Sequence, residues 1–156
     1  MIMADILFWI AIAIGLLLTF VAHWLAAQAL APALVNRCAE VYGQRPWACC
    51  LIGTLVGLPL TTILLTLINV LPHPALKILG IGLLAVLLIL AFIGSAGLAR
   101  RIGLGLAAGE ESAGRTTLRG GTVLALTFLA PILGWFVLMP LAFLSGLGAW
   151  LIGRKA

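Results

Sequence analysis

Long uncharged runs of apolar residues, separated by short polar clusters, dominate the sequence. The first run extends from Ile6 to Asn36, and we expect its helix to stop near Ala31 because Pro32 follows. A helix over residues 6–31 would measure about 39 Å at ~1.5 Å per residue, enough to cross a hydrocarbon core of ~30 Å. This run therefore predicts a membrane-spanning helix.

Two tryptophans indicate how deep this helix would sit. Trp9 and Trp24 are 15 positions apart, and indole rings favour the membrane–water interface. We therefore expect one ring near each interface. The residues that follow, 35–47, carry three charged side chains and are predicted to form a polar link.

The next two apolar runs predict a helical hairpin. Residues 48–71 and 75–98 are each long enough to span the membrane. The prolines of Pro72-His73-Pro74 prevent one continuous helix, so the chain should turn there. Beyond Leu98 the sequence becomes polar and rich in glycine, so residues 99–115 are predicted to be a cytoplasmic link.

The last apolar run, Gly121–Gly153, is too long for one crossing. As a single helix its 33 residues would measure about 50 Å. The segment Pro131–Trp135 contains a proline, a glycine and an interface-seeking ring, which together predict a turn. The two arms would be residues 116–130 and 135–153, the first of them short or re-entrant.

The distribution of positive charge favours this division. With a C-terminal hairpin, eight basic residues fall on one side of the membrane and only Lys77 on the other. The eight are Arg37, Arg45, Arg100, Arg101, Arg115, Arg119, Arg154 and Lys155. The positive-inside rule then places the N-terminus outside and the C-terminus in the cytoplasm. We predict an all-α, polytopic transmembrane bundle of four to five segments, forming one membrane domain over residues 1–156.

Composition excludes a soluble monomer. Apolar residues make up 64% of the chain, charged residues only 8%, and the mean hydropathy is +1.29. Too few polar side chains are present to cover a water-exposed surface, so we expect a multi-pass protein of the bacterial inner membrane. The net charge of +5 lies in short gaps between apolar runs, which argues against nucleic acid as a partner.

Small residues at helical spacing predict close helix packing. Gly53, Gly57 and Thr61 follow one face of the second segment. A similar stripe on the first segment comprises Ala11, Gly15, Thr19, Ala22 and Ala26. Packing within the chain is the favoured explanation for both stripes, and an interface with another subunit or a second copy is the alternative.

His23 raises the question of a cofactor. A membrane histidine facing small residues can ligate haem iron or chlorophyll magnesium. A bis-histidine haem would need a second buried histidine, however, and His73 is predicted at the opposite end of the hydrophobic slab. We therefore expect no cofactor, and interpret His23 as an interfacial or interhelical hydrogen-bonding group.

The polar link resembles a phosphate-binding loop only in spacing. Residues 109–116 match the GxxxxGK[ST] pattern with arginine in place of lysine. No strand precedes them, and Glu110 and Glu111 would repel phosphate, so no nucleotide is expected. We predict instead that Arg100, Arg101, Arg115 and Arg119 lie at the membrane surface near lipid headgroups.

The last third of the chain resembles the membrane-embedded tails of bacterial bactofilin-like, polymer-forming proteins. The similarity runs from Arg100-Arg101-Ile-Gly103 through Pro131-Ile-Leu-Gly134-Trp135 to Gly146-Leu-Gly148-Ala149. This chain lacks the repetitive β-rich polymerising domain of that group. The resemblance therefore implies a membrane-embedded region, and neither scaffold formation nor any functional residue is carried over from that group.

The sequence favours a non-enzymatic role. It contains no Ser/His/Asp set, carboxylate pair or intramembrane acid. We predict a small integral subunit or assembly factor of a larger membrane complex. A homo-oligomeric channel or small-solute permease, and a haem- or chlorophyll-holding subunit through His23, are the alternatives.

Overall fold

The computed structural model describes residues 2–70, 73–106, 112–130 and 132–154, and this part of the chain is built from helices. It forms six α-helices and one π-helical turn, η1. Their bounds are α1 Ile2–Leu30, α2 Pro32–Gln44, α3 Pro46–Val70, α4 Pro74–Leu106, α5 Ala113–Phe128, η1 Gly134–Leu138 and α6 Met139–Gly153. The predicted all-α bundle is confirmed.

Four helical stretches are long and apolar enough to cross a membrane. They are Asp5–Leu30, Pro46–Val70, Pro74–Leu106 and Gly134–Gly153. Many of their large apolar side chains are exposed, among them Leu7, Leu55 and Ile78, as expected for surfaces that face lipid. The chain is a multi-pass membrane protein.

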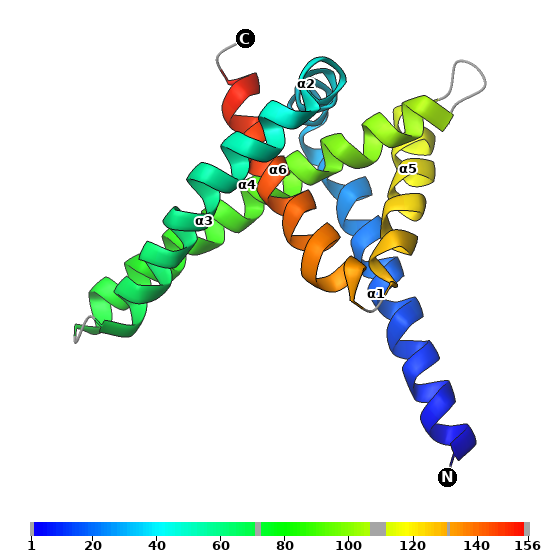
Figure 1. Cartoon of the computed structure of the whole chain (residues 1–156), viewed down its shortest axis with the longest axis horizontal. Coiled ribbons are helices and arrows are strands. Elements are labelled where there is room, and N and C mark those ends of the chain that lie inside the picture. Colours follow the sequence, from blue (N-terminus) through cyan, green and yellow to red (C-terminus); the bar gives the residue numbers. More distant parts are fainter. Residues whose placement is uncertain (1, 71–72, 107–111, 131, 155–156) are drawn as a thin grey trace.

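The helices form a bundle with two projecting arms (Figure 1). The C-terminal half of α4 lies at the centre and contacts α2, α5 and α6. At one end of the molecule, the first half of α1 and the tip of the α3–α4 hairpin point away from each other. The opposite end carries α2 and the C-terminal end of α6.

The expected polar link over residues 35–47 is wrong, because most of it is helix α2. Pro32 occupies the first turn, where its missing N–H costs nothing, and so starts a new helix after α1 ends. The buried side chains of α2 recur at helical spacing and pack against α4 and α6. They are Val35, Cys38, Ala39 and Tyr42.

The predicted end of the third segment at Leu98 is also wrong. Helix α4 continues to Leu106, so the first part of the expected 99–115 link is helical. Gly103 in this extension is a packing site against the backbone of Thr116, and Gly120 of α5 lies against Ala99. Close backbone contact offsets the roughly 1 kcal/mol by which each glycine weakens a helix. Residues 107–111, with the first three positions of the phosphate-loop-like pattern over 109–116, lie outside the described residues.

The C-terminal run folds as a hairpin, which excludes one long helix over residues 121–153. Helix α5 ends at Phe128, and η1 and α6 return along the bundle. Gly134 begins the return so close to the carbonyl of Phe128 that a Cβ would lie 2.5 Å from its oxygen. At the other end of α6, a Cβ on Gly153 would lie 3.9 Å from Cβ of Arg37. The end of α6 therefore lies beside α2.

Trp24 is completely buried in the bundle. Its predicted depth near a membrane interface stays a prediction. Its indole Nε1 donates a hydrogen bond of 3.0 Å to Ser95 Oγ on α4, and its ring stacks on Phe20. The indole also contacts Phe128 of α5 edge to face. A polar partner and two aromatic rings hold Trp24 inside the protein.

Two further hydrogen bonds join helices that are distant in sequence. Tyr42 of α2 bonds to Ser145 of α6 across 2.9 Å, and Thr117 of α5 donates to Gln28 of α1 across 3.4 Å. These four side chains are all buried. The pairs fix the register of α2 on α6 and of α1 on α5.

Candidate functional site

The glycine stripe of α3 packs inside the chain. Gly53 lies directly against the backbone carbonyl of Leu144 in α6, leaving no room for a Cβ. One turn on, a Cβ at Gly57 would lie 2.8 Å from Cδ2 of Leu144. Both glycines are buried. They therefore bring α3 and α6 into close contact, as the favoured interpretation of this stripe expected.

Helix α6 also contacts α4 through glycine, since Gly146 lies against Gly94 of α4. On the α3 side, Gly148 lies against the backbone of Cys49. Helix α6 is thus held between α3 and α4 through glycines on all three helices. These backbone contacts leave no room for a side chain at Gly53, Gly94, Gly146 or Gly148.

Hydroxyl groups of α3 bond to their own helix. Thr61 Oγ1 donates to the carbonyl of Gly57 at 2.8 Å, and Thr62 and Thr66 make the same bond one turn back. Asn69 Nδ2 donates to the carbonyl of Leu65. Since these groups are satisfied within α3, they provide no evidence for a polar pathway.

The small-residue stripe of α1 has a different environment. Its five members, Ala11, Gly15, Thr19, Ala22 and Ala26, are all exposed, and a Cβ on Gly15 would meet no atom of another helix within 4 Å. The opposite face of α1 packs into the bundle through Phe20, Trp24 and Ala27. The favoured expectation that this stripe packs within the chain is therefore wrong, because larger side chains occupy the core-facing side of α1.

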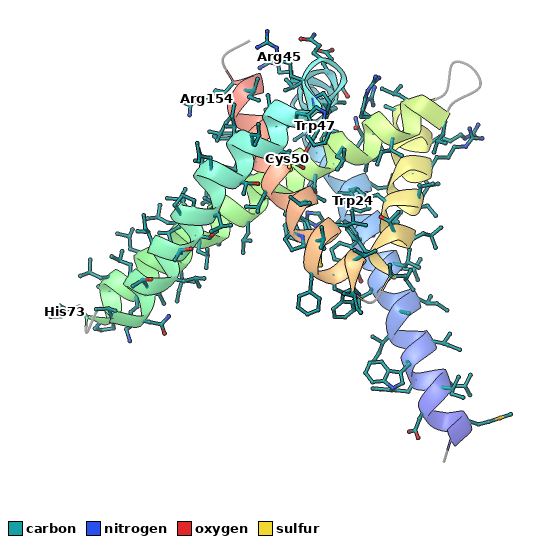
Figure 2. The ribbon with its side chains drawn as sticks, in the orientation of Figure 1. Trp24, Arg45, Trp47, Cys50, His73 and Arg154 are labelled. Atoms are coloured by element: carbon teal, nitrogen blue, oxygen red, sulfur yellow. The ribbon has the colours of Figure 1, made fainter. Side chains whose placement is uncertain are left out.

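His23 lies at the side of the aromatic cluster. Its ring centroid is 4.4 Å from that of Phe92, which in turn lies 4.5 Å from Phe143. The other histidine, His73, is at the far tip of the α3–α4 hairpin (Figure 2). The two histidines are not brought together, and the ring of His23 contacts apolar surface.

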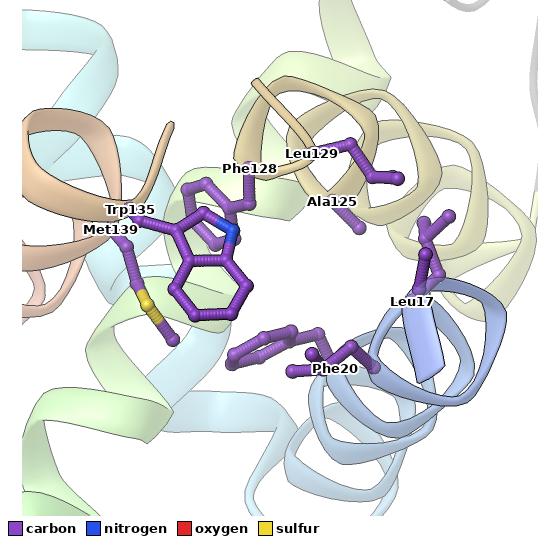
Figure 3. A pocket seen from close by; sticks show the side chains of 9 residues that line it. Leu17, Phe20, Ala125, Phe128, Leu129, Trp135 and Met139 are labelled. Atoms are coloured by element: carbon purple, nitrogen blue, oxygen red, sulfur yellow. The ribbon is translucent and has the colours of Figure 1, made fainter. Parts of the chain in front are cut away.

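An apolar cavity lies between α1, α5 and η1 (Figure 3). Its volume is about 370 Å³, and Figure 3 shows the rings of Phe20, Phe128 and Trp135 around the space. Leu17, Leu129 and Met139 complete much of the lining. The π-helical turn, an uncommon element that often marks functional sites, carries Trp135 to the rim. Sequence patterns did not predict this cavity, because its walls come from four elements, α1, α5, η1 and α6.

The predicted membrane-surface arginines lie on two helices. Arg100 is half-buried at the C-terminal half of α4, whereas Arg101 is exposed. Arg115 and Arg119 are exposed on the first turns of α5. Arg45 and Arg154 occupy the same end of the molecule, together with the exposed ring of Trp47 (Figure 2).

The buried thiol and phenol of α2 are poorly reactive. Burial raises the pKa of the Cys38 thiol to about 11, so the nucleophilic thiolate is scarce at neutral pH. Burial also raises the pKa of Tyr42, against the opposing effect of its hydrogen bond to Ser145. No group of three or more His, Cys, Asp or Glu side chains suited to a metal ion occurs within the described ranges.

Comparison with family models, curated proteins and solved structures finds no match to this chain. The bactofilin-like resemblance of the C-terminal third stays a prediction. Functional inference therefore depends on the surfaces of the molecule itself.

Proposed function

We propose that the protein is a non-enzymatic, integral subunit of a larger bacterial inner-membrane complex, and that the small-residue face of α1 receives a transmembrane helix of a partner protein. The observation that carries this proposal is the exposure of all five small residues of that face, on a helix whose other side is packed. Small side chains let a second helix backbone approach closely.

The remainder of the chain supports this use of small residues. On each of α3, α4 and α6, at least one buried glycine contacts the backbone of a neighbouring helix: Gly53, Gly94, Gly146 and Gly148. The small-residue face of α1 is a surface of the same kind and extends over four turns, but its small residues are exposed and not covered by another helix of this chain. Its first half also extends beyond the bundle, where Phe8 and Trp9 are exposed. A partner helix would cover this length.

A leucine at Gly15 should release the partner. The substitution Gly15→Leu places a branched side chain in the contact and should reduce copurified partner by about tenfold, the effect of losing about 1.4 kcal/mol. Gly82→Leu is the matched control, because Gly82 of α4 is also exposed and has open space around it. Quantitative mass spectrometry of gently purified membranes measures both.

Both variants should fold as the wild type does, which circular dichroism checks. Equal retention of partners by Gly15→Leu and wild type would contradict the proposal. Cross-linking from position 15 only to position 15 of another copy would instead identify a homodimer.

We further propose that the end bearing α2 faces the cytoplasm. Arg45 and Arg154 lie at that end, and the positive-inside rule assigns such an end to the cytoplasm. Cysteines introduced for the exposed Arg37 and Arg154, in a background without native cysteines, should both resist an impermeant thiol reagent in intact cells. Labelling of either position before lysis would reverse the orientation.

A further inference from the structure

A polar cavity lies between α2 and the last turns of α4, on a different part of the molecule from the exposed face of α1. Its volume is about 360 Å³. The lining includes both arginines of α4 and the polar side of α2. The residues that matter are Asn36, Glu40, Gln44, Arg100, Arg101 and Leu104.

Two buried polar atoms at this cavity have no hydrogen-bond partner among the described residues. They are Oδ1 of Asn36, an acceptor, and an Nη of Arg100, a donor. Buried polar groups are almost always paired, so these two atoms, on residues that line the cavity, are candidates to hydrogen-bond a bound group. A group that paired with both would accept a hydrogen bond from Arg100 and donate one to Asn36.

The second arginine is placed beside the first. A Cβ on Gly43 would lie 3.3 Å from Cζ and from Nε of Arg101, so the guanidinium rests against the backbone of α2. Two guanidinium groups on adjacent residues favour phosphate, whose oxygens accept paired N–H donors. With Glu40 included, the formal charge around the cavity is +2 −1 = +1. A ligand of charge −1 would neutralise it.

The position of the cavity indicates a lipid. It lies against α2, at the end of the bundle where the apolar span of α3 begins and where Trp47 exposes its ring. Tryptophan is enriched at the headgroup level of the bilayer. Leu104, which is 44% exposed, provides an apolar edge for the glycerol and acyl carbons.

We propose that this cavity binds the headgroup of phosphatidylglycerol. Arg100 and Arg101 donate to the phosphate oxygens, and a hydroxyl of the terminal glycerol donates to Oδ1 of Asn36. The single negative charge of this lipid matches the +1 of the cavity. Phosphatidylcholine carries no headgroup donor and no net charge, whereas phosphatidic acid carries the phosphate without the terminal glycerol.

Native mass spectrometry of the full chain in mild detergent, titrated with each of these three lipids, tests the proposal. The wild type should retain phosphatidylglycerol about tenfold more than phosphatidylcholine, as expected for charge-assisted hydrogen bonds. Arg100→Gln should remove this preference. Asn36→Leu should keep the preference over phosphatidylcholine but lose discrimination against phosphatidic acid.

Arg115→Gln is the matched control, because it removes the same charge from an exposed arginine outside the cavity. It should leave lipid retention unchanged. A loss equal to that of Arg100→Gln would mean that general surface charge is responsible and would overturn the proposal. Arg101→Gln provides a second, exposed cavity variant if Arg100→Gln fails to fold, and it should also reduce retention.

A competition experiment with a soluble phosphate ester distinguishes binding of the lipid from binding of a free phosphate ester. Glycerol 3-phosphate carries similar polar groups without acyl chains, and it should fail to displace phosphatidylglycerol at equal concentration. Displacement at equal concentration would overturn the assignment to a lipid. Equal retention of all three lipids by the wild type would also overturn it.

Discussion

Gly53→Leu is expected to separate α3 from α6 and to lower the free energy of unfolding by about 3 kcal/mol or more. The reason is that Gly53 lies against the backbone carbonyl of Leu144, and backbone cannot rotate away as a side chain can. Titration with a denaturing detergent, followed by circular dichroism, measures the loss.

Gly57→Ala provides a graded control on the same helix. A Cβ at Gly57 meets only the end of the Leu144 side chain, at 2.8 Å, and that methyl can turn aside. We expect a loss of about 1 kcal/mol or less, at the mild end of the cost of overpacking. A mild effect of Gly53→Leu, equal to that of Gly57→Ala, would show that α3 and α6 do not touch at this point.

Trp24→Ala is expected to cost about 3–5 kcal/mol of unfolding free energy, the range for removing a large buried aromatic side chain. The substitution deletes the indole that joins α1 to α4 and α5, and it leaves the hydroxyl of Ser95 without its donor. Differential scanning calorimetry in mild detergent should show a clearly lower Tm.

Trp9→Ala is the natural comparison, since it removes the same side chain from the same helix. Trp9 is 67% exposed, so the expected change is within about 0.5 kcal/mol. Equal losses at positions 9 and 24 would contradict the burial of Trp24.

The sequence predicts well the features that depend on one local property, such as the length of an apolar run or the position of a proline. The span of α3 and its hairpin with α4 follow from an uncharged run and the prolines beside His73. The C-terminal hairpin follows from a length that one crossing cannot accommodate. The shared location of Arg45 and Arg154 agrees with the charge count.

The features that sequence reasoning missed depend on tertiary packing. Helix α2 carries polar and charged residues between its apolar ones, and four residues at helical spacing bury against other helices. Glycines after Leu98 weaken a helix in isolation, and the contact of Gly103 with α5 favours the extension of α4. Both errors came from judging a segment without its neighbours.

The candidate sites illustrate the same limit. The stripe of small residues on α1 is plain in the sequence, but only the fold reveals which face of α1 the core uses. Asn36 and Arg100 are 64 positions apart, and no pattern along the chain indicates that they share a cavity. Proximity of this kind comes from the packing of α2 on α4.

The position of α6 between α3 and α4 has a consequence for biosynthesis. A ribosome completes α6 only after every helix that it contacts has been made. The glycines of α3 and α4 therefore enter the bilayer before α6, the helix that they contact, has been synthesised. During that interval lipid or an insertion factor must occupy the slot, and the entry of α6 displaces it and closes the bundle.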